Sequence, residues 1–412
     1  MAIPFLGRPP LRWPRTPWKS GAPASSSPCP RPEPVSEKIA GWINERIPLE
    51  WGFLRKALDE PIPRHMHKWW FCLGGTPLYL FVIQLLSGLS LAVYYVPEPR
   101  MAFESVRYIT QEAPFGWWVR GVHRWSAELM VVSVILHMIR VFFTGAFRRP
   151  RELNWFIGMG LLVAVLTFAF SGYSLVYNQL SYWATVVGAN ITSAVPLVGN
   201  FAAGFLRGGP EITANTLTRM YILHIAVLPV ATVALIAFHL LLLRLHGVSE
   251  QEEGAREEEK SGRYFPFYPD HLMTELAVGI FLIFSISQLA IILPVGLGEP
   301  ANPAVTPADI KPEWYFWPVF RYLKLFSFKV GIVSLVFFVA AMFAWPWIDA
   351  AIERRLPGRN VGFYFGAFAA VTMVMLLVVE GFSGQATFIS LFFAVAVAVV
   401  VALFVLKGLL KH

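Results

Sequence analysis

Four histidines in two long apolar segments have a spacing that suits metal binding. His123 and His137 are 14 residues apart, and His224 and His239 are 15 residues apart. In an α-helix, either separation is roughly 21 to 22 Å, with a net rotation of about −40° or +60°. Each pair therefore lies near one face of its helix. Because neutral imidazole is a good iron ligand, each helix could bind iron at two depths.

The two histidine-bearing segments are separated by one further apolar segment, so as membrane helices they would run in the same direction. If they face each other, His123 is level with His224 near the outer side, and His137 is level with His239 near the inner side. This predicts two bis-histidine sites stacked across a membrane, each suited to an iron porphyrin. The alternative is that each histidine is a hydrogen-bonded interior residue, but the paired pattern favours iron.

Glycines and arginines near these segments support a bound macrocycle. A residue without a side chain lets a flat ring approach the helix backbone. Two neighbouring apolar segments each carry glycines 14 residues apart: Gly74 and Gly88, and Gly158 and Gly172. Arg120 and Arg140 lie three residues outside the histidine pair of their helix, where a guanidinium could bind porphyrin propionates. Arg140 could equally anchor the helix end at the membrane surface.

The composition places these helices in a membrane. The 412 residues are 56% hydrophobic and only 15% charged, and apolar runs of about twenty residues are long enough to cross the hydrocarbon core. Backbone polar groups cannot stay open in lipid, so the runs are helices. Eight runs are predicted to cross: residues 73–96, 122–144, 155–177, 218–243, 273–295, 328–348, 362–381 and 385–407.

The net charge of +8 does not indicate nucleic-acid binding, because the basic residues lie in short loops between apolar runs. Basic residues in such loops instead indicate which loops lie on the cytoplasmic side of the membrane. With a cytoplasmic N-terminus, an even number of crossings returns the C-terminus to the same side. The basic residues then on the inside are Arg148, Arg149, Arg151, Arg354, Arg355, Arg359, Lys407 and Lys411.

The chain is predicted to contain five segments. A Pro-, Arg- and Ser-rich extension is followed by an amphipathic stretch that suits a helix on the membrane surface. A highly charged linker separates two membrane modules, and a long Pro-rich loop from Leu297 to about Arg321 lies in the second. The boundaries are residues 1–66 for the extension and surface helix, 67–247 for the four-helix module, 248–263 for the linker, 264–382 for the three-helix module and 383–412 for an additional crossing.

Cys29 and Cys72 are the two cysteines, and they cannot form a disulfide scaffold. There is no Cys-x-x-Cys-His stretch to attach an ordinary c-type haem. Any iron must therefore be held mainly by histidine.

Several short motifs resemble cytochrome b6 followed by subunit IV, that is, a cytochrome b of the bc/b6f family. The resemblance covers about residues 38 to 382, and the motifs occur in the family's order. They are Phe71-Cys-Leu-Gly-Gly, Val122-His-Arg-Trp-Ser-Ala, Arg149-Pro-Arg-Glu-Leu, Ser171-Gly-Tyr-Ser-Leu, Thr216-Leu-Thr-Arg-Met-Tyr and Pro312-Glu-Trp-Tyr-Phe. The implied fold is an all-α membrane protein with a four-helix di-haem bundle, a three-helix subunit IV-like module and one extra C-terminal crossing, eight in total.

The resemblance implies that His123 and His224 bind haem bL, and that His137 and His239 bind haem bH. The 15-residue spacing of the second pair matches the b6 type. The chain departs from b6 in being fused to the subunit IV part, in having an eighth crossing, and in carrying Val176-Tyr-Asn-Gln where the family usually has Pro-Trp-Asp-Gln near the outer quinone pocket.

The resemblance also implies residues for quinone chemistry. Glu313 and Tyr315 belong to the outer quinol-oxidation site, where a carboxylate can accept a proton from the quinol. Asp270 matches an acidic residue near the inner quinone site. Cys72, together with Arg244, matches the position where b6-type proteins attach a further haem, c_i or c_n, through one thioether; a lone cysteine is otherwise usually a small buried apolar residue. Glu275 stands where the family has an aromatic residue near that haem.

The implied function is that of a catalytic, proton-translocating subunit of a quinol:cytochrome c or plastocyanin-type oxidoreductase. Quinol oxidation at the outer site would send one electron to a Rieske iron–sulfur partner and the other through haems bL and bH to an inner quinone site. A c-type cytochrome is the second expected partner, in a homodimeric complex in the lipid of a prokaryotic plasma membrane. Two other classes are a membrane anchor or transporter with intramembrane histidines, and a di-haem quinone subunit of another dehydrogenase.

Overall fold

The computed structural model describes residues 73–247, 272–307, 310–383 and 388–409, the backbone of 61–63 and 264–266, and Trp42, Glu45 and Arg46. The chain divides into two units, Met1–Trp42 and Ile43–His412, and the fold below is that of the second. Most of the predicted extension and surface helix, and all of the predicted linker 248–263, lie outside the described residues.

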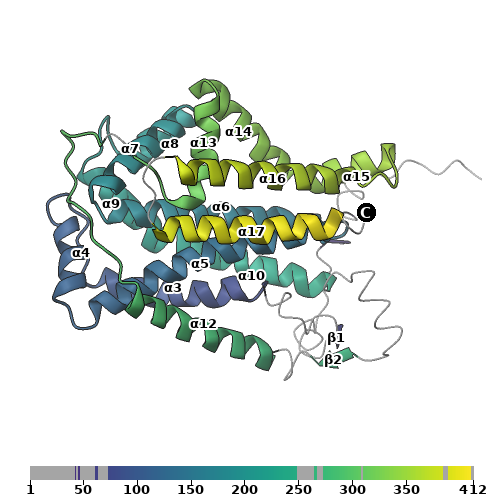
Figure 1. Ribbon diagram of the computed structural model, residues 1–412, viewed down its shortest axis with the longest axis horizontal. Coiled ribbons are helices and arrows are strands. Elements are labelled where there is room, and N and C mark those ends of the chain that lie inside the picture. Colours follow the sequence, from purple (N-terminus) through teal and green to yellow (C-terminus); the bar gives the residue numbers. More distant parts are fainter. Residues whose placement is uncertain are drawn as a thin grey trace, which may run out of the picture. The chain divides into compact units, whose positions relative to one another are not determined.

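The described part is almost entirely helical (Figure 1). Its first half contains α3 (Thr76–Ala92), α4 (Ala102–Gln111), α5 (Gly116–Phe143), α6 (Glu152–Leu175), α7 (Gln179–Ser193), α8 (Gly199–Arg207), α9 (Ala214–Ile222), the π-helical turn η3 (Leu223–Val227) and α10 (Leu228–His246). Its second half contains α12 (Leu272–Ile292), the 3-10 turn η5 (Trp314–Phe316), α13 (Trp317–Leu325), α14 (Phe328–Phe343), α15 (Trp345–Arg355), α16 (Val361–Phe382) and α17 (Phe388–Leu409).

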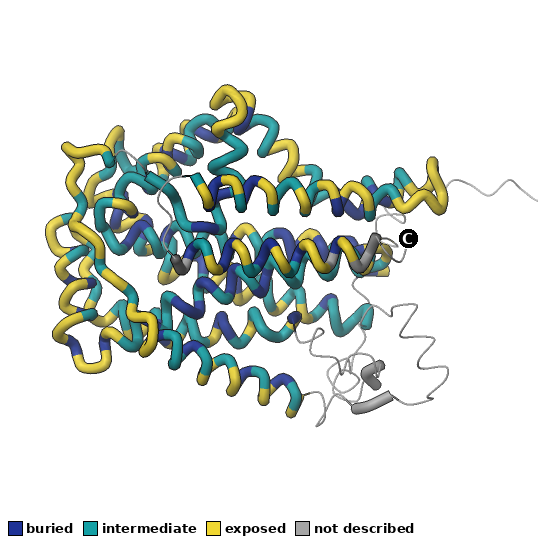
Figure 2. Tube along the Cα trace, viewed as in Figure 1, coloured by how far each residue is buried: buried dark blue, intermediate teal, exposed yellow. Residues whose placement is uncertain are grey.

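Each of the eight predicted crossings falls mainly on helical residues, although 218–243 includes a π-helical turn and 328–348 covers two helices, and this confirms an all-α integral membrane fold. Among the described residues, five helices are long and apolar enough to span a membrane, or six if the bent pair α14 and α15 is one span. Two further apolar helices are shorter, at Thr76–Ala92 and at Ser390–Leu403 within α17. Many residues of α12 and α16 with large apolar side chains are exposed, as expected of surfaces that lipid covers. Figure 2 shows exposed residues along both helices.

The crossing predicted over 328–348 is not straight. The chain bends by 74° between α14 and α15, next to Pro346, which has no backbone N–H to continue the helix. The carbonyl of Met342, four residues before this proline, accepts a hydrogen bond of 2.7 Å from the indole of Trp155 on α6. A side chain of the first module thus satisfies a carbonyl at the break in the second.

The first four crossings form one bundle, and the second module packs on it. In the bundle, α3 packs on α5, α10 packs on α6, and α5 contacts α6. α12 lies against α5, and α17 contacts α5, α16 and η5. One buried apolar core therefore joins the two modules; its members include Leu80, Trp125, Val131, Ile286, Trp314, Phe393 and Val397.

The short polar helices gather at one end of the bundle, where α4, α7, α8 and α9 lie in Figure 1. The predicted topology makes this the outer end. A small antiparallel strand pair lies outside the helical part, with Pro61 opposite Pro266 and Pro63 opposite Tyr264. It links the segments that precede α3 and α12.

Candidate functional site

The structure brings the four histidines together as two pairs, His123 and His137 from α5 facing His224 of η3 and His239 of α10. The rings of His123 and His224 have centroids 6.3 Å apart and an angle of 70° between their planes. The rings of His137 and His239 have centroids 6.5 Å apart and an angle of 73°. The two pairs therefore have nearly the same geometry, at two depths in the bundle.

A π-helical turn explains how a 15-residue spacing on one helix matches a 14-residue spacing on the other. The turn Leu223–Val227 contains His224, and the N–H of Leu228 bonds to the carbonyl of Leu223, five residues back. One wider turn takes up the additional residue, so His239 meets His137 as directly as His224 meets His123. Pro229, which cannot donate a backbone hydrogen bond, lies two residues after the end of this turn.

Each of the four predicted glycines faces one histidine ring. A methyl group added at the glycine would lie 3.1 Å from the ring at Gly88 and only 2.6 Å at Gly172, against 3.8 Å at Gly74 and 3.7 Å at Gly158. Gly74 faces His137, Gly88 faces His123, Gly158 faces His239 and Gly172 faces His224. The missing side chain at each glycine thus lets an imidazole approach the backbone of the neighbouring helix, most closely at Gly88 and Gly172.

Two serines that the sequence reasoning missed orient the outer pair. Ser87 Oγ lies 2.9 Å from His123 Nδ1, and Ser171 Oγ lies 3.0 Å from His224 Nδ1. A group that holds Nδ1 leaves Nε2 free to bind a metal. The signal was present in the sequence, because each serine directly precedes one of the two outer glycines.

The two pairs fit a six-coordinate iron in a macrocycle. A metal–imidazole bond is about 2 Å long, so two rings with centroids a little over 6 Å apart leave room for one metal between them. Among the described residues, no group of three or more His, Cys, Asp or Glu side chains could bind a metal. Two protein ligands per site are what an iron needs when a porphyrin supplies the other four nitrogens.

A cluster of charged and aromatic side chains lies beside the outer pair. Arg124, the residue after His123, uses one nitrogen, Nη2, to contact two carboxylates: Glu128 Oε1 at 2.6 Å and Glu313 Oε2 at 2.8 Å. The indole of Trp314 donates a hydrogen bond of 2.7 Å to the other oxygen of Glu128. The segment that begins at Glu313 is thus tied to α5 at two points.

Comparison with known proteins decides the family. The model for "Cytochrome b/b6/petB" matches residues 57–247, and the model for "Cytochrome b(C-terminal)/b6/petD" matches residues 300–406. The chain belongs to the cytochrome b/b6 family. The C-terminal match extends to residue 406, so the eighth helix, α17, falls within the family model.

Individual relatives agree with the fused architecture. A cytochrome bc complex cytochrome b subunit of Chlorobaculum thiosulfatiphilum is 37% identical over 361 residues, which cover 85% of this chain and 82% of that protein. A cytochrome b6 of Heliomicrobium gestii is 45% identical over 209 residues, 51% of this chain and 98% of that protein. A solved chain of a hyperthermophilic respiratory Complex III matches with a TM-score of 0.69 at 27% identity, covering 89% of this chain and 97% of that one.

The chain is therefore a membrane-embedded cytochrome b subunit of a bc/b6f-type complex. A cytochrome b carries haem b, and the two histidine pairs are the residues of this chain that suit it. Membership in this family excludes the two alternative classes: the chain is neither a membrane anchor or transporter nor the subunit of an unrelated dehydrogenase.

The predicted arginines lie at opposite ends of the bundle. Arg120 donates two hydrogen bonds of 2.8 Å, to the carbonyls of Val295 and Gly296, so in this cytochrome b it holds the segment after α12. Arg140 and Arg244 are in the last turns of α5 and α10, at the inner end with His137 and His239.

The predicted inner-site residues are described only in part. Cys72 and Asp270 lie outside the described residues. Glu275, in the first turn of α12, is buried, and its carboxylate packs against Gly75 at the start of α3. It is thus one residue away from Gly74, which faces His137.

Helix α13, which follows Glu313 and Tyr315, is anchored by a carboxylate that the sequence reasoning missed. Glu380 on α16 is fully buried, and Lys324 Nζ lies 3.0 Å and Arg321 Nη1 3.7 Å from its oxygens. The indole N–H of Trp317 bonds to the carbonyl of Pro312 at 2.8 Å. These contacts fix α13 on α16 and so define where the Pro-Glu-Trp-Tyr segment lies.

The segment Val176-Tyr-Asn-Gln, which differs from the family's usual sequence, contacts the long loop at the predicted outer end. Asn178 caps α7 and donates to the carbonyl of Leu297, and Gln179 binds the backbone at Asn302 and Val305. Tyr177 has a left-handed backbone with φ of 52°, and burial raises the pKa of its hydroxyl. This segment therefore holds the long outer loop in place.

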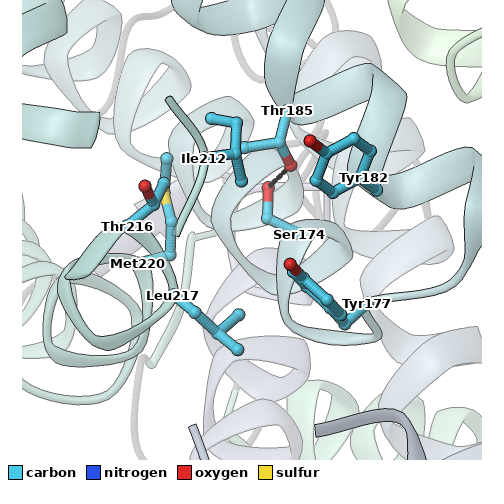
Figure 3. Close-up of a pocket in the computed structure, with 8 residues that line it drawn as sticks. All are labelled: Ser174, Tyr177, Tyr182, Thr185, Ile212, Thr216, Leu217 and Met220. Carbon is cyan, nitrogen blue, oxygen red and sulfur yellow. Dashed lines mark hydrogen bonds between the residues drawn. The ribbon is translucent and has the colours of Figure 1, made fainter. Parts of the chain in front are cut away.

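Tyr177 also borders a small cavity behind α7 (Figure 3). The volume is about 10 Å³, room for about one water molecule. Two of its polar groups, the hydroxyls of Thr185 and Ser174, already bond to each other at 2.8 Å. The cavity is too small for a quinol ring. The lining residues are Ser174, Tyr177, Tyr182, Thr185, Ile212, Thr216, Leu217 and Met220.

Proposed function

We propose that this cytochrome b oxidises quinol at the outer side of the membrane and reduces quinone at the inner side. One observation carries the proposal: neighbouring residues of α5 serve both tasks that quinol oxidation requires. His123 belongs to the outer histidine pair, and Arg124 holds the carboxylate of Glu313. The proposed haem-binding pair and the proposed proton acceptor are thus each joined to α5 at one of two consecutive residues.

The histidine pairs are proposed to hold two b haems, bL at His123 and His224 and bH at His137 and His239. Haem b at these two depths would supply one-electron carriers across the membrane. The chain's own part is to orient the imidazoles, through Ser87 and Ser171 at the outer pair, and to keep the adjoining backbone open at the four glycines.

At the outer side, Glu313 is the proposed proton acceptor. A quinol that becomes a quinone loses two electrons and two protons. One electron leaves to a Rieske-type iron–sulfur partner and the second enters this chain. The Glu313 carboxylate takes one of the two quinol protons and passes it outward, and the other proton is also released at the outer side. Tyr315, two residues on, offers a hydroxyl for the same pocket. Arg124 keeps the carboxylate in place between turnovers.

At the inner side, quinone is proposed to be reduced near Asp270 and Cys72. Proton uptake here and proton release at the outer side, with electron movement between them, store energy across the membrane. Moving one charge through 100 mV is worth about 2.3 kcal/mol. Arg140, Arg244 and Glu275 are charged residues at the described inner helix ends and suit the binding of anionic or protonatable groups there.

The proposed partners are a Rieske iron–sulfur protein and a c-type cytochrome, in a homodimeric complex. The relative from Chlorobaculum thiosulfatiphilum is a subunit of a cytochrome bc complex, and the matching solved chain is from a respiratory Complex III. A plasma membrane with both termini in the cytoplasm agrees with the basic residues of the inner loops.

Quinol-driven reduction of the purified complex tests this function. Addition of quinol should produce a reduced-minus-oxidised absorption spectrum with b-type haem bands, and the electron acceptor of the complex should become reduced at the same time. Quinol that reduces neither would contradict the proposal, and so would a preparation of the assembled complex without b-type bands.

We further propose that a third haem is attached covalently at Cys72. Gly74, two residues on, faces His137, and Glu275 reaches the adjoining Gly75, so the chain near Cys72 lies beside the inner pair. We expect the denatured chain to stain for haem peroxidase activity on a gel, and the Cys72→Ser variant to lose the stain. An unstained wild-type band, or a stain that survives the substitution, would reject attachment at this cysteine.

A further inference from the structure

We infer that Glu128 is a positioning residue that keeps Arg124 neutralised while Glu313 accepts a proton. The inference rests on the proposed function of Glu313 and extends it to a residue that has no counterpart among the sequence-predicted site residues. Glu128 lies on α5, one helical turn after Arg124, and its side chain is only 2% exposed. An ionisable side chain at such a depth in a membrane helix is a candidate for function.

The geometry shows that Arg124 is shared between two carboxylates. Its Nη2 atom lies 2.6 Å from Glu128 and 2.8 Å from Glu313. Glu128 is also held by the indole of Trp314 at 2.7 Å, and Trp314 in turn stacks on Phe393 of α17, with ring centroids 5.8 Å apart and planes 12° apart. Glu128 is thus held by both Arg124 and Trp314 and is 2% exposed, whereas Glu313 is 13% exposed.

Charge counting explains why the second carboxylate matters. Arg124 carries one positive charge and the two glutamates carry one negative charge each, so the three side chains sum to −1. When Glu313 takes a proton the cluster becomes neutral, and Arg124 stays paired with Glu128. If Glu128 were absent, the same step would turn a neutral pair into a lone guanidinium about two turns inside a membrane helix, which is unfavourable.

The other groups near Glu313 do not replace Glu128 in this role. Tyr173 of α6 and Tyr315 are electrostatically coupled to Glu313 and are neutral phenols. Glu380 of α16 is engaged with Lys324 and Arg321. Among the described residues that surround Arg124, Glu128 is therefore the carboxylate that can hold it when Glu313 is protonated.

The test is a double-mutant cycle of Glu128→Gln and Glu313→Gln in the assembled complex. The glutamine at 128 keeps an oxygen for the Trp314 indole but has no charge for Arg124. We expect Glu128→Gln alone to slow quinol oxidation by about tenfold or more, part of the roughly 10²–10⁴-fold that a placed proton acceptor contributes. When Glu313→Gln is already present, Glu128→Gln should cause little further loss of rate, because Glu128 acts through Glu313.

Infrared spectroscopy supplies a readout that a purely structural role would not change. During quinol oxidation the wild-type complex should show the carbonyl band of a protonated carboxyl, and this band should be absent in Glu313→Gln and weakened in Glu128→Gln. Glu128→Asp keeps the charge and should retain the band, with a rate above that of Glu128→Gln. If the complex with Glu128→Gln does not assemble, the Glu128→Asp variant tests the inference instead. Loss of the carbonyl band in Glu128→Asp would overturn it.

The matched control is Glu104→Gln, the same substitution in a solvent-exposed pair with Arg107 on α4, which should oxidise quinol at the wild-type rate. If Glu313→Gln has the wild-type rate, the proposed role of Glu313 fails. If Glu313→Gln is slow but Glu128→Gln is as fast as wild type, or slows both backgrounds equally, only the inference about Glu128 fails.

Discussion

Replacing His137 by alanine should remove one of the two proposed b haems from the complex. The ring of His137 lies 6.5 Å from that of His239, and with one imidazole missing an iron between them would lose its low-spin, six-coordinate state. Loss even of a group that only orients a metal ligand costs roughly 10–100-fold in affinity, and loss of the ligand itself should cost more. We therefore expect haem b per chain to fall by about half.

The measurement is the pyridine haemochrome content together with the reduced-minus-oxidised spectrum, in which one b-type component should disappear. His239→Ala should have the same effect, because it removes the other member of the pair. His246→Ala is the matched control on the same helix. His246 Nε2 lies 3.2 Å from the backbone carbonyl of Glu45 and faces no histidine pair, so its loss should leave haem content unchanged. An unaltered spectrum in His137→Ala would refute the assignment.

Glu313→Gln should slow quinol oxidation on the order of 10²-fold while both b haems stay bound. The amide oxygen can still accept a hydrogen bond from Arg124, which lies 2.8 Å from the carboxylate, so the segment should keep its position. The amide cannot take the quinol proton, and a positioned proton acceptor typically contributes about 10²–10⁴-fold. Most of the loss should therefore appear in kcat.

Steady-state quinol oxidation by the whole complex, measured beside the haem spectrum, checks this expectation. An intact spectrum with a low rate supports proton acceptance by Glu313. A wild-type rate would contradict it, and a low rate together with lost haem would show that Glu313 has a structural role instead.

Much of the candidate site could be predicted because helices convert sequence spacing into position. The separations between His123 and His137, and between His224 and His239, predicted two levels in the membrane, and the structure places the rings in pairs at two levels. The glycines at the same spacing were predicted on the neighbouring crossings, and each faces one ring. Regular periodicity along a helix is a local property, so the sequence carries it directly.

Local irregularities of the helices were harder to predict from the sequence. The π-helical turn at Leu223–Val227 adjusts the second helix by one residue, and regular α-helical geometry alone left a difference of about 100° between the two separations. The bend of 74° between α14 and α15 likewise interrupts the crossing predicted over 328–348. Pro229 marked the first irregularity and Pro346 the second, but a proline alone does not show how the helix around it adjusts.

The sequence by itself determined the membrane character of this cytochrome b, its family, the order of its helices and the residues of its histidine pairs, because apolar length and helical spacing are properties of one segment at a time. Only the tertiary structure decided which side chains complete the outer site. Arg124 and Glu313 are 189 positions apart, and Glu128 and Trp314 are 186 apart. Contacts between residues so distant in the chain depend on how α5, η5 and α17 pack together, and no local pattern specifies that packing.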